Sequence, residues 1–154
     1  MQLYGRGIRR RLAPMLGNDR HRIEMAYALQ FTLPGTPVIR YGEEIGMGDD
    51  LSLKERDAIR TPMQGNDAAN AGFSTAPAKQ LARPVISKGE LGYEEVNVAA
   101  QRRDPGSLLH WMERALLTLR ECPELGIGTC VPVDTGEPSV LALRYDGPGG
   151  SCWP

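Results

Sequence analysis

The sequence predicts an α/β fold, because a helical apolar pattern runs through a tight turn into a short β-branched strand. Apolar residues recur at helical spacing from Ile23 to Leu29, and a Pro-Gly pair ends that pattern. Residues 36–41 (Thr-Pro-Val-Ile-Arg-Tyr) are then mainly β-branched and aromatic, as a buried strand requires. A helix, a turn and an apolar strand together make half of a parallel α/β repeat.

A second helix is predicted in the last third of the chain. Asp104 can cap its first turn, Pro105 takes the first helical position, and Pro123 stops it. Between them, leucines, methionine and Trp111 form one apolar stripe at helical spacing, which predicts a core-facing helix.

The last 27 or so residues change to an alternating pattern, which indicates antiparallel strands. Residues 130–133 and 140–145 are short apolar runs joined by turn residues. Residues 146–154 are rich in glycine and proline and predict no third strand. A lone hairpin is marginally stable, so we expect its partners elsewhere.

Charge and composition exclude several classes of function. A formal net charge of −1 gives no electrostatic attraction to nucleic acid or anionic membranes. The run Arg9–Arg11 lacks interleaved aromatics, so we interpret it as a solvated helix face. No targeting signal and no apolar run of about 20 residues are present. Three cysteines without a CxxC motif predict neither a disulfide scaffold nor a metal site, and favour a reducing cytoplasm.

Carboxylate pairs are the only candidate catalytic groups, since motifs for nucleotide, zinc-protease and serine-hydrolase chemistry are missing. The pairs are Glu43-Glu44, Asp49-Asp50 and Glu94-Glu95. Retaining glycoside cleavage needs two carboxyls about 5–5.5 Å apart, facing one bond. Adjacent residues on a strand face opposite sides, so Glu43 and Glu44 are not expected to form that pair, and each pair alone is a weak signal. Glu43 and Glu44 follow the predicted strand, where α/β folds gather ligand sites.

Several long motifs resemble a known family. Residues 33–47 (LPGTPVIRYGEEIGM) resemble the last barrel strand and following loop of the α-amylase superfamily of glycoside hydrolases. Residues 48–74, with the runs IRTPMQ and NAGFS, are similar to the branch that contains oligo-1,6-glucosidases, sucrose isomerases and trehalose synthases. Residues 96–126 most closely resemble trehalose synthases, which interconvert maltose and trehalose.

The resemblance implies a partial (β/α)8 TIM barrel. Residues 1–126 would form the C-terminal portion of an α-amylase-type catalytic barrel, namely its last helix–strand–helix part. Residues 127–154 would form the truncated start of a C-terminal, antiparallel β domain. Members of this family use three carboxylates on earlier strands, and these have no match in the chain. We therefore expect a fragment that is inactive when isolated.

The resemblance also implies a site. Arg60 matches an arginine that reaches the non-reducing glucose of the bound substrate, while Glu43 and Glu44 are expected to support the pocket wall. Gly65 stands where the family usually has tryptophan, so an aromatic surface for sugar is missing. No residue of the chain is assigned as catalytic or as a metal ligand.

The family implies no cofactor, although full-length members can carry a structural calcium ion, for which no ligand set is identified. The expected partner is a small sugar, maltose or trehalose, with no nucleic acid or membrane, and homo-oligomerisation is left open. Two alternatives remain: a fragment of an α-glucosidase or oligo-1,6-glucosidase of the same branch, and a non-catalytic remnant or interaction module.

Overall fold

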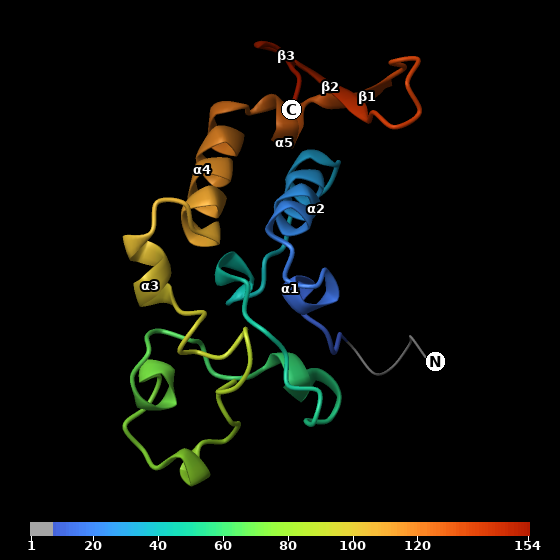
Figure 1. Cartoon of the computed structure of the whole chain (residues 1–154). Coiled ribbons are helices and arrows are strands. Elements are labelled where there is room, and N and C mark those ends of the chain that lie inside the picture. Colours follow the sequence, from blue (N-terminus) through green and yellow to red (C-terminus); the bar gives the residue numbers. More distant parts are fainter. Residues whose placement is uncertain (1–7) are drawn as a thin grey trace. The chain divides into compact units, whose positions relative to one another are not determined.

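The computed structural model describes residues 8–154, which divide into two compact units (Figure 1). The first unit comprises the chain up to Glu24 together with Ile39–Met112. The second comprises Met25–Val38 and Glu113–Pro154. Two helices, α2 (Arg20–Thr32) and α4 (Leu108–Glu121), each contribute residues to both units.

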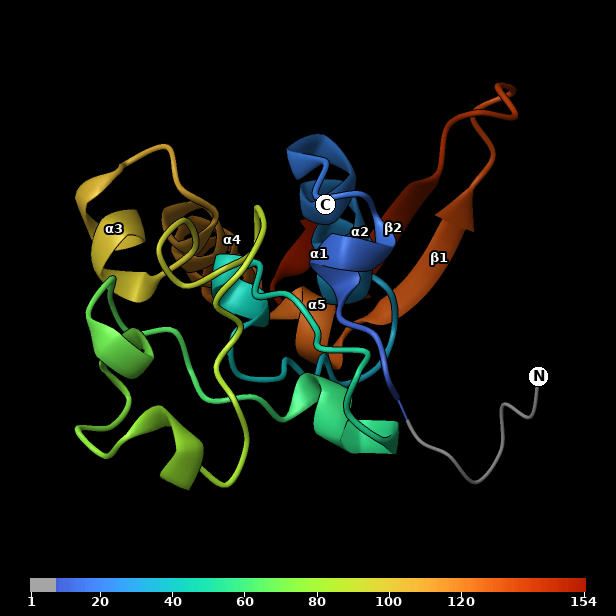
Figure 2. The same ribbon diagram turned by 60° about the horizontal axis from the view of Figure 1, so that its bottom comes forward.

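The first unit is made of short helices and long irregular segments, as Figure 2 shows for the stretch from the green to the yellow part of the chain. Its other α-helices are α1 (Leu12–Met15) and α3 (Val98–Arg103). Single-turn 3-10 helices lie between them, at Glu43–Ile45, Glu55–Ile59, Ala69–Gly72 and Ala78–Gln80. The glycine- and proline-rich composition of this stretch explains why it forms turns rather than regular elements.

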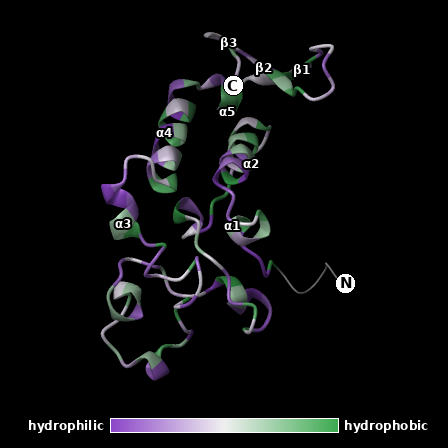
Figure 3. Ribbon diagram, viewed as in Figure 1, coloured by the Kyte–Doolittle hydropathy of each residue, from purple (hydrophilic) through white to green (hydrophobic). Residues whose placement is uncertain are grey.

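Buried side chains hold the irregular part of the first unit in place. Ile45, Met47 and Ile59 form part of an apolar core, and the hydropathy colouring of Figure 3 shows apolar residues scattered through this part rather than in one stripe. Gln64 is fully buried and its Nε2 donates to the carbonyl oxygens of Leu91 and Val96. Such bonds satisfy backbone groups that no helix or strand pairs.

The second unit contains a three-stranded antiparallel sheet in the order β1-β2-β3. Its strands are β1 (Thr129–Val133), β2 (Ala142–Gly147) and β3 (Gly150–Cys152), preceded by the short helix α5 (Glu124–Ile127). Tyr145 of β2 is 2% exposed, and its hydroxyl donates to the carbonyl oxygen of Thr32, the last residue of α2.

The two predicted helices are confirmed, with one change at an end. Asp19 caps α2, since its Oδ1 accepts from the backbone N of Arg22 at 3.1 Å. The prediction that Asp104 caps the later helix is wrong. Asp104 instead ends α3, and α4 begins at Leu108 after Ser107, whose Oγ accepts from the backbone N of His110 at 3.3 Å.

The predicted strand over residues 36–41 is not present in the described structure. Thr36 to Arg40 pair with no strand, and Val38 is 79% exposed. A strand is defined by hydrogen bonds to a neighbour, and within residues 8–154 no segment lies alongside this one to form a ladder.

The prediction that residues 146–154 form no third strand is also wrong. Gly147 pairs with Gly150, Asp146 with Ser151, and Tyr145 with Cys152. Gly150 has a φ of +143°, a conformation that side chains rarely adopt, so glycine allows the tight reversal that returns the chain along β2.

Candidate functional site

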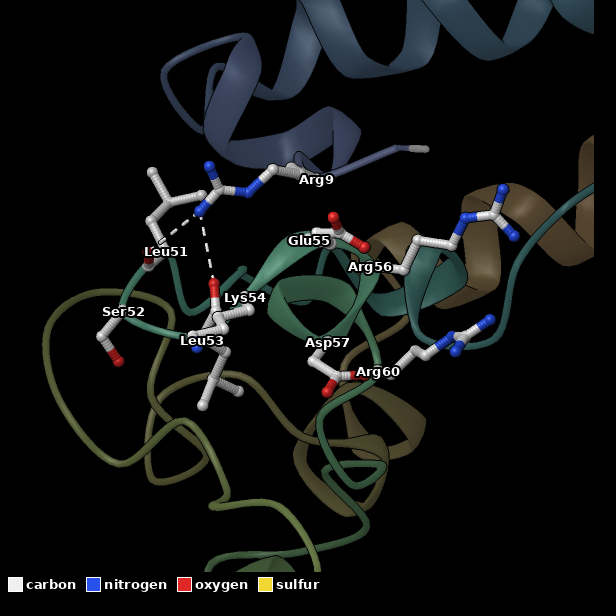
Figure 4. A pocket seen from close by; sticks show the side chains of 9 residues that line it. All are labelled: Arg9, Leu51, Ser52, Leu53, Lys54, Glu55, Arg56, Asp57 and Arg60. Carbon is white, nitrogen blue, oxygen red and sulfur yellow. Dashed lines mark hydrogen bonds between the residues drawn. The ribbon is translucent and has the colours of Figure 1, made fainter. Parts of the chain in front are cut away.

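Arg60 lies at the edge of a hollow in the first unit, immediately after the 3-10 helix Glu55–Ile59. The hollow has a volume of about 540 Å³ and is lined by Arg9, residues 51–57 and Arg60. In Figure 4 the side chains of Arg56 and Arg60 extend to the same side of this helix. Arg9 lies at another edge of this hollow, where its Nη2 donates to the carbonyl oxygens of Leu51 and Leu53 at 3.2 and 3.3 Å.

Arg60 also lines a second, less polar hollow of about 310 Å³. The other lining residues are Tyr41, Thr61, Pro62, Met63, Phe73, Leu81, Ala82 and Arg83. Phe73 is 58% exposed, so an aromatic face is open to solvent beside the arginine. No hydrogen bond or ion pair joins the Arg60 side chain to any described residue, which leaves its donors available.

The backbone on both sides of Arg60 is anchored by side chains from earlier in the chain. Nη2 of Arg11 donates to the carbonyl oxygen of Ile59 at 3.0 Å. The hydroxyl of Tyr41 donates to the carbonyl oxygen of Thr61 at 2.8 Å. Arg60 therefore has an exposed side chain on a fixed backbone, which is the arrangement that a preformed binding residue needs.

Glu43 contacts Arg11, the residue that holds the backbone before Arg60. Nη1 of Arg11 donates to Oε1 of Glu43 at 3.2 Å and to the carbonyl oxygen of Tyr41 at 2.8 Å. The other carboxylate oxygen of Glu43 accepts from the backbone N of Leu12 at 3.2 Å. The Arg11 side chain is fully buried and stacks its guanidinium 5.3 Å from the Tyr41 ring centroid. A buried charge of this kind requires its partner.

The predicted site residues are thus only partly brought together. Arg60 lines both hollows, whereas Glu43 and Glu44 line neither. Both glutamates lie in the 3-10 helix that follows Gly42, whose φ of +85° is left-handed. Glu43 faces the buried arginine, and its role as a support for the pocket stays a prediction.

The interpretation of Arg9–Arg11 as a solvated helix face is wrong for Arg11. Arg11 is 1% exposed, and it precedes α1 rather than lying in this helix. Arg9 and Arg10 are exposed, and Arg10 pairs with Asp49 at 2.8 Å. A run of three arginines gives no local signal of which one is buried, because the carbonyl oxygens that accept from Arg11 are 30 and 48 residues away.

Gly65, where the family usually has tryptophan, lies against a strained turn. Its backbone N donates to the carbonyl oxygen of Ala71 at 2.9 Å, and Ala71 and Asn70 have positive φ values of 59° and 55°. A Cβ at Gly65 would lie 3.2 Å from that oxygen. A larger residue here therefore requires the turn to shift.

The side chains that line the two hollows offer hydrogen-bond donors and charge. Arg56 and Arg60 present planar donors, and Asp57 pairs with Arg83 at 2.8 Å. Among residues 8–154, no group of three or more His, Cys, Asp or Glu side chains is arranged to hold a metal ion. In the same range, no helix is both long enough and apolar enough to cross a membrane.

A model of the α-amylase catalytic domain matches residues 9–125. The chain belongs to the α-amylase family. It is 47% identical over 143 residues to a trehalose synthase from Pimelobacter sp. (strain R48), covering 93% of this chain and 25% of that protein. It is also 44% identical over 127 residues to the amino acid transporter heavy chain SLC3A1 of Rattus norvegicus, covering 77% of this chain and 18% of that protein.

A solved enzyme structure shares the fold of this chain. The trehalulose synthase MutB from Pseudomonas mesoacidophila MX-45 superposes with a TM-score of 0.71 at 24% identity, covering 92% of this chain and 31% of that structure. The chain therefore spans about a fifth to a third of the length of these relatives. Recognition of an α-amylase-family sequence close to trehalose synthases is confirmed.

Proposed function

We propose that this chain supplies part of the substrate pocket of an enzyme that interconverts maltose and trehalose. In this proposal, residues 1–126 belong to a (β/α)8 barrel and residues 127–154 begin a β domain. The observation that carries the proposal is Arg60: its side chain is exposed on an anchored backbone, in a segment 47% identical to a trehalose synthase.

Arg60 would bind hydroxyl groups of one glucose unit. Its guanidinium carries several donors in one plane, which suits neighbouring hydroxyls or a carboxylate. Phe73 and Met63 in the less polar hollow offer an apolar surface for the face of a sugar ring. Arg60 would therefore position the disaccharide, and it is not proposed to make or break a bond.

The carboxylates of the retaining reaction would come from elsewhere in the enzyme. Retention requires one carboxylate as nucleophile and one carboxyl as acid/base on either side of the scissile bond. Glu43 does not suit either role, because Arg11 and the backbone N of Leu12 already occupy both of its oxygens. The same pocket could also serve an α-glucosidase of this branch, in which water replaces the retained glucose.

A non-catalytic role is the second candidate. One relative carries the name of an amino acid transporter heavy chain, and it shares 44% identity over 127 residues with this chain. A segment of this sequence type therefore also occurs in a protein that is not named as an enzyme.

A chimera would test these possibilities. The 143 aligned residues of the Pimelobacter trehalose synthase would be replaced by this chain, and the purified chimera would be incubated with maltose. Formation of trehalose supports the proposal, and glucose alone supports the α-glucosidase alternative. A folded chimera that produces neither, while the parent enzyme is active, would favour the non-catalytic role. The chain alone is expected to produce no trehalose.

A further inference from the structure

Two aromatic side chains of the described residues line the less polar hollow, and they differ in what already contacts their rings. The hydroxyl of Tyr41 donates to the carbonyl oxygen of Thr61 at 2.8 Å. The guanidinium carbons of Arg11 and Arg40 each lie 5.3 Å from the Tyr41 ring centroid. Because cations of the chain already cover the Tyr41 ring, Phe73 is the aromatic ring of this hollow that is open to a ligand.

Phe73 is a large apolar side chain that its surroundings leave uncovered. It is 58% exposed, and among residues 8–154 no aromatic or cation–π contact involves its ring. Arg60 lines the same hollow with a guanidinium that has no partner in this range. An aromatic face beside a charged donor can bury one side of a ligand and bind its polar rim.

The backbone that carries Phe73 is fixed by an unusual turn. Asn70, Ala71 and Gly72 have φ values of +55°, +59° and +67°, so three consecutive residues are left-handed. This conformation is unfavourable for residues with a side chain, and they normally adopt it singly. Such strain persists only where the surrounding structure imposes it, and it is concentrated at functional sites.

Asn70 holds the chain on both sides of Phe73. Its carbonyl oxygen accepts from the backbone N of Phe73 at 3.0 Å. Its side-chain Nδ2 donates to the carbonyl oxygens of Ser74 and Ala76 at 3.0 and 2.7 Å. Asparagine is also one of the residues that adopt a left-handed backbone most readily. Asn70 therefore sets the position from which the Phe73 side chain reaches the hollow.

The turn is also tied to the chain that precedes it. Ala71 is fully buried, and its carbonyl oxygen accepts from the backbone N of Gly65 at 2.9 Å and of Asn66 at 3.1 Å. A Cβ at Gly72 would lie 2.5 Å from both Oδ1 and Nδ2 of Asn66, so no side chain fits directly before Phe73 unless Asn66 moves. The exposed ring is therefore held by a preorganised backbone.

We propose that Phe73, positioned by Asn70, stacks on the apolar face of a pyranose ring whose hydroxyl groups bind Arg60. This inference rests on the proposed function, and it names the ring form of the sugar as what the hollow recognises. A glucopyranose carries C–H groups on its two faces and hydroxyls around its rim. The Phe73 ring would cover one face while the guanidinium binds the rim. An open-chain polyol offers the same hydroxyls but lacks the face.

The chain contains only two phenylalanines, which makes a direct test possible. Phenylalanine rings would be labelled with 13C, and the full chain would be titrated with maltose, which it is not expected to convert. We expect the Phe73 ring resonances to shift and to show nuclear Overhauser effects from sugar C–H protons. The resonances of Phe31, which is 6% exposed and lies in the second unit, should stay unchanged. Sorbitol, which has no ring, should give no such contact.

Variants separate stacking from a merely structural role. Phe73→Leu loses one set of ring signals and so identifies them. Phe73→Ala should weaken maltose binding about three- to tenfold, measured by saturation transfer to the sugar, whereas Phe73→Trp should retain it. Asn70→Gly permits the left-handed backbone but removes the amide, and it should reduce the response of the Phe73 ring to maltose. Met15→Ala is the control, because Met15 is 62% exposed and lines neither hollow.

Phe73 resonances that ignore maltose, an equal shift with sorbitol, or unchanged affinity in Phe73→Ala would each overturn the proposal. Its failure is separable from that of the proposed function. A chimera that forms trehalose while the Phe73 ring ignores maltose removes this inference alone. A folded chimera that forms neither trehalose nor glucose, while maltose still contacts the Phe73 ring of the chain, removes the proposed function and supports the stacking site.

Discussion

Arg11 donates a hydrogen bond from Nη2 to the carbonyl oxygen of Ile59 at 3.0 Å, across 48 residues of sequence. The next residue is Arg60, which lines both hollows of the candidate site. Because Tyr41 holds the carbonyl oxygen of Thr61 at 2.8 Å, Arg60 is fixed from both sides. Arg11 thus positions the candidate binding residue, although Arg11 itself lines neither hollow.

Arg11→Ala should destabilise the chain strongly. The substitution leaves the Glu43 carboxylate, whose side chain is 13% exposed, without its buried partner, and it also releases the carbonyl oxygens of Tyr41 and Ile59. Breaking a buried ion pair from one side costs about 3–5 kcal/mol of unfolding free energy. Urea unfolding followed by circular dichroism would measure this change.

Arg10→Ala is the matched control for that experiment. Arg10 pairs with Asp49, but its own side chain is 42% exposed. The variant should therefore lose at most about 1 kcal/mol of unfolding free energy. Equal losses for the two variants would show that burial does not distinguish these neighbouring arginines.

Arg60→Ala, introduced into the trehalose synthase chimera, should lower kcat/KM for maltose about ten- to a hundredfold, because a hydrogen bond from a charged donor is lost. Arg60→Lys should recover only part of the activity, since an ammonium group lacks the planar arrangement of donors. Coupled assays of trehalose and glucose formation would give kcat and KM for each variant.

Arg102→Ala provides the comparison, because Arg102 is an exposed arginine of α3 that lines neither hollow. Its kinetics should match those of the unmodified chimera. If Arg60→Ala also matched, Arg60 would be an ordinary surface residue.

Gly42→Ala should cost more stability than a left-handed backbone alone explains. Gly42 has a φ of +85°, and an added Cβ would lie 2.3 Å from Sδ of Met47 and 3.2 Å from Nη1 of Arg11. Gly89→Ala is the control, because its φ of +73° is similar and nothing lies within 4 Å of an added Cβ. The left-handed conformation costs about 1–2 kcal/mol in both variants. Overpacking should add about 1–3 kcal/mol at Gly42 only, as measured by urea unfolding.

Acid should break the side-chain contact of Asp146 with Ser151 between β2 and β3. Asp146 accepts from Oγ of Ser151 at 2.7 Å and from Nη2 of Arg144 at 2.9 Å, and these contacts, the serine first, lower the pKa of the Asp146 carboxyl below 3.8. A lowered folded-state pKa means that this stabilisation is present above pH 3.8 and is lost as the pH falls through the folded-state value. The Ser151 amide resonance in NMR spectra should therefore shift in that acidic range.

Asp146→Asn removes the titrating group while preserving the shape of the side chain. In this variant the Ser151 resonance should not change over the same pH range. A transition that persists in the variant would assign the acid sensitivity to another carboxylate.

The sequence by itself determined the elements whose signals are local. The apolar spacing of α2, the stripe of α4, and the alternating runs of β1 and β2 depend on neighbours within a few residues. The family could also be recognised from the sequence, because its motifs, such as Ile59–Gln64, are contiguous stretches of the chain. Arg60 was identified in this way, through its place in a motif.

Only the tertiary structure decided which residues support that motif and which strands pair. The burial of Arg11 depends on acceptors at Tyr41, Glu43 and Ile59, and the third strand depends on the pairing of Tyr145 with Cys152. Residues 36–41 have strand-like composition but lack a ladder, since a strand needs a neighbour to accept and donate its hydrogen bonds. Burial and pairing are properties of distant partners, and the pattern along one segment does not contain them.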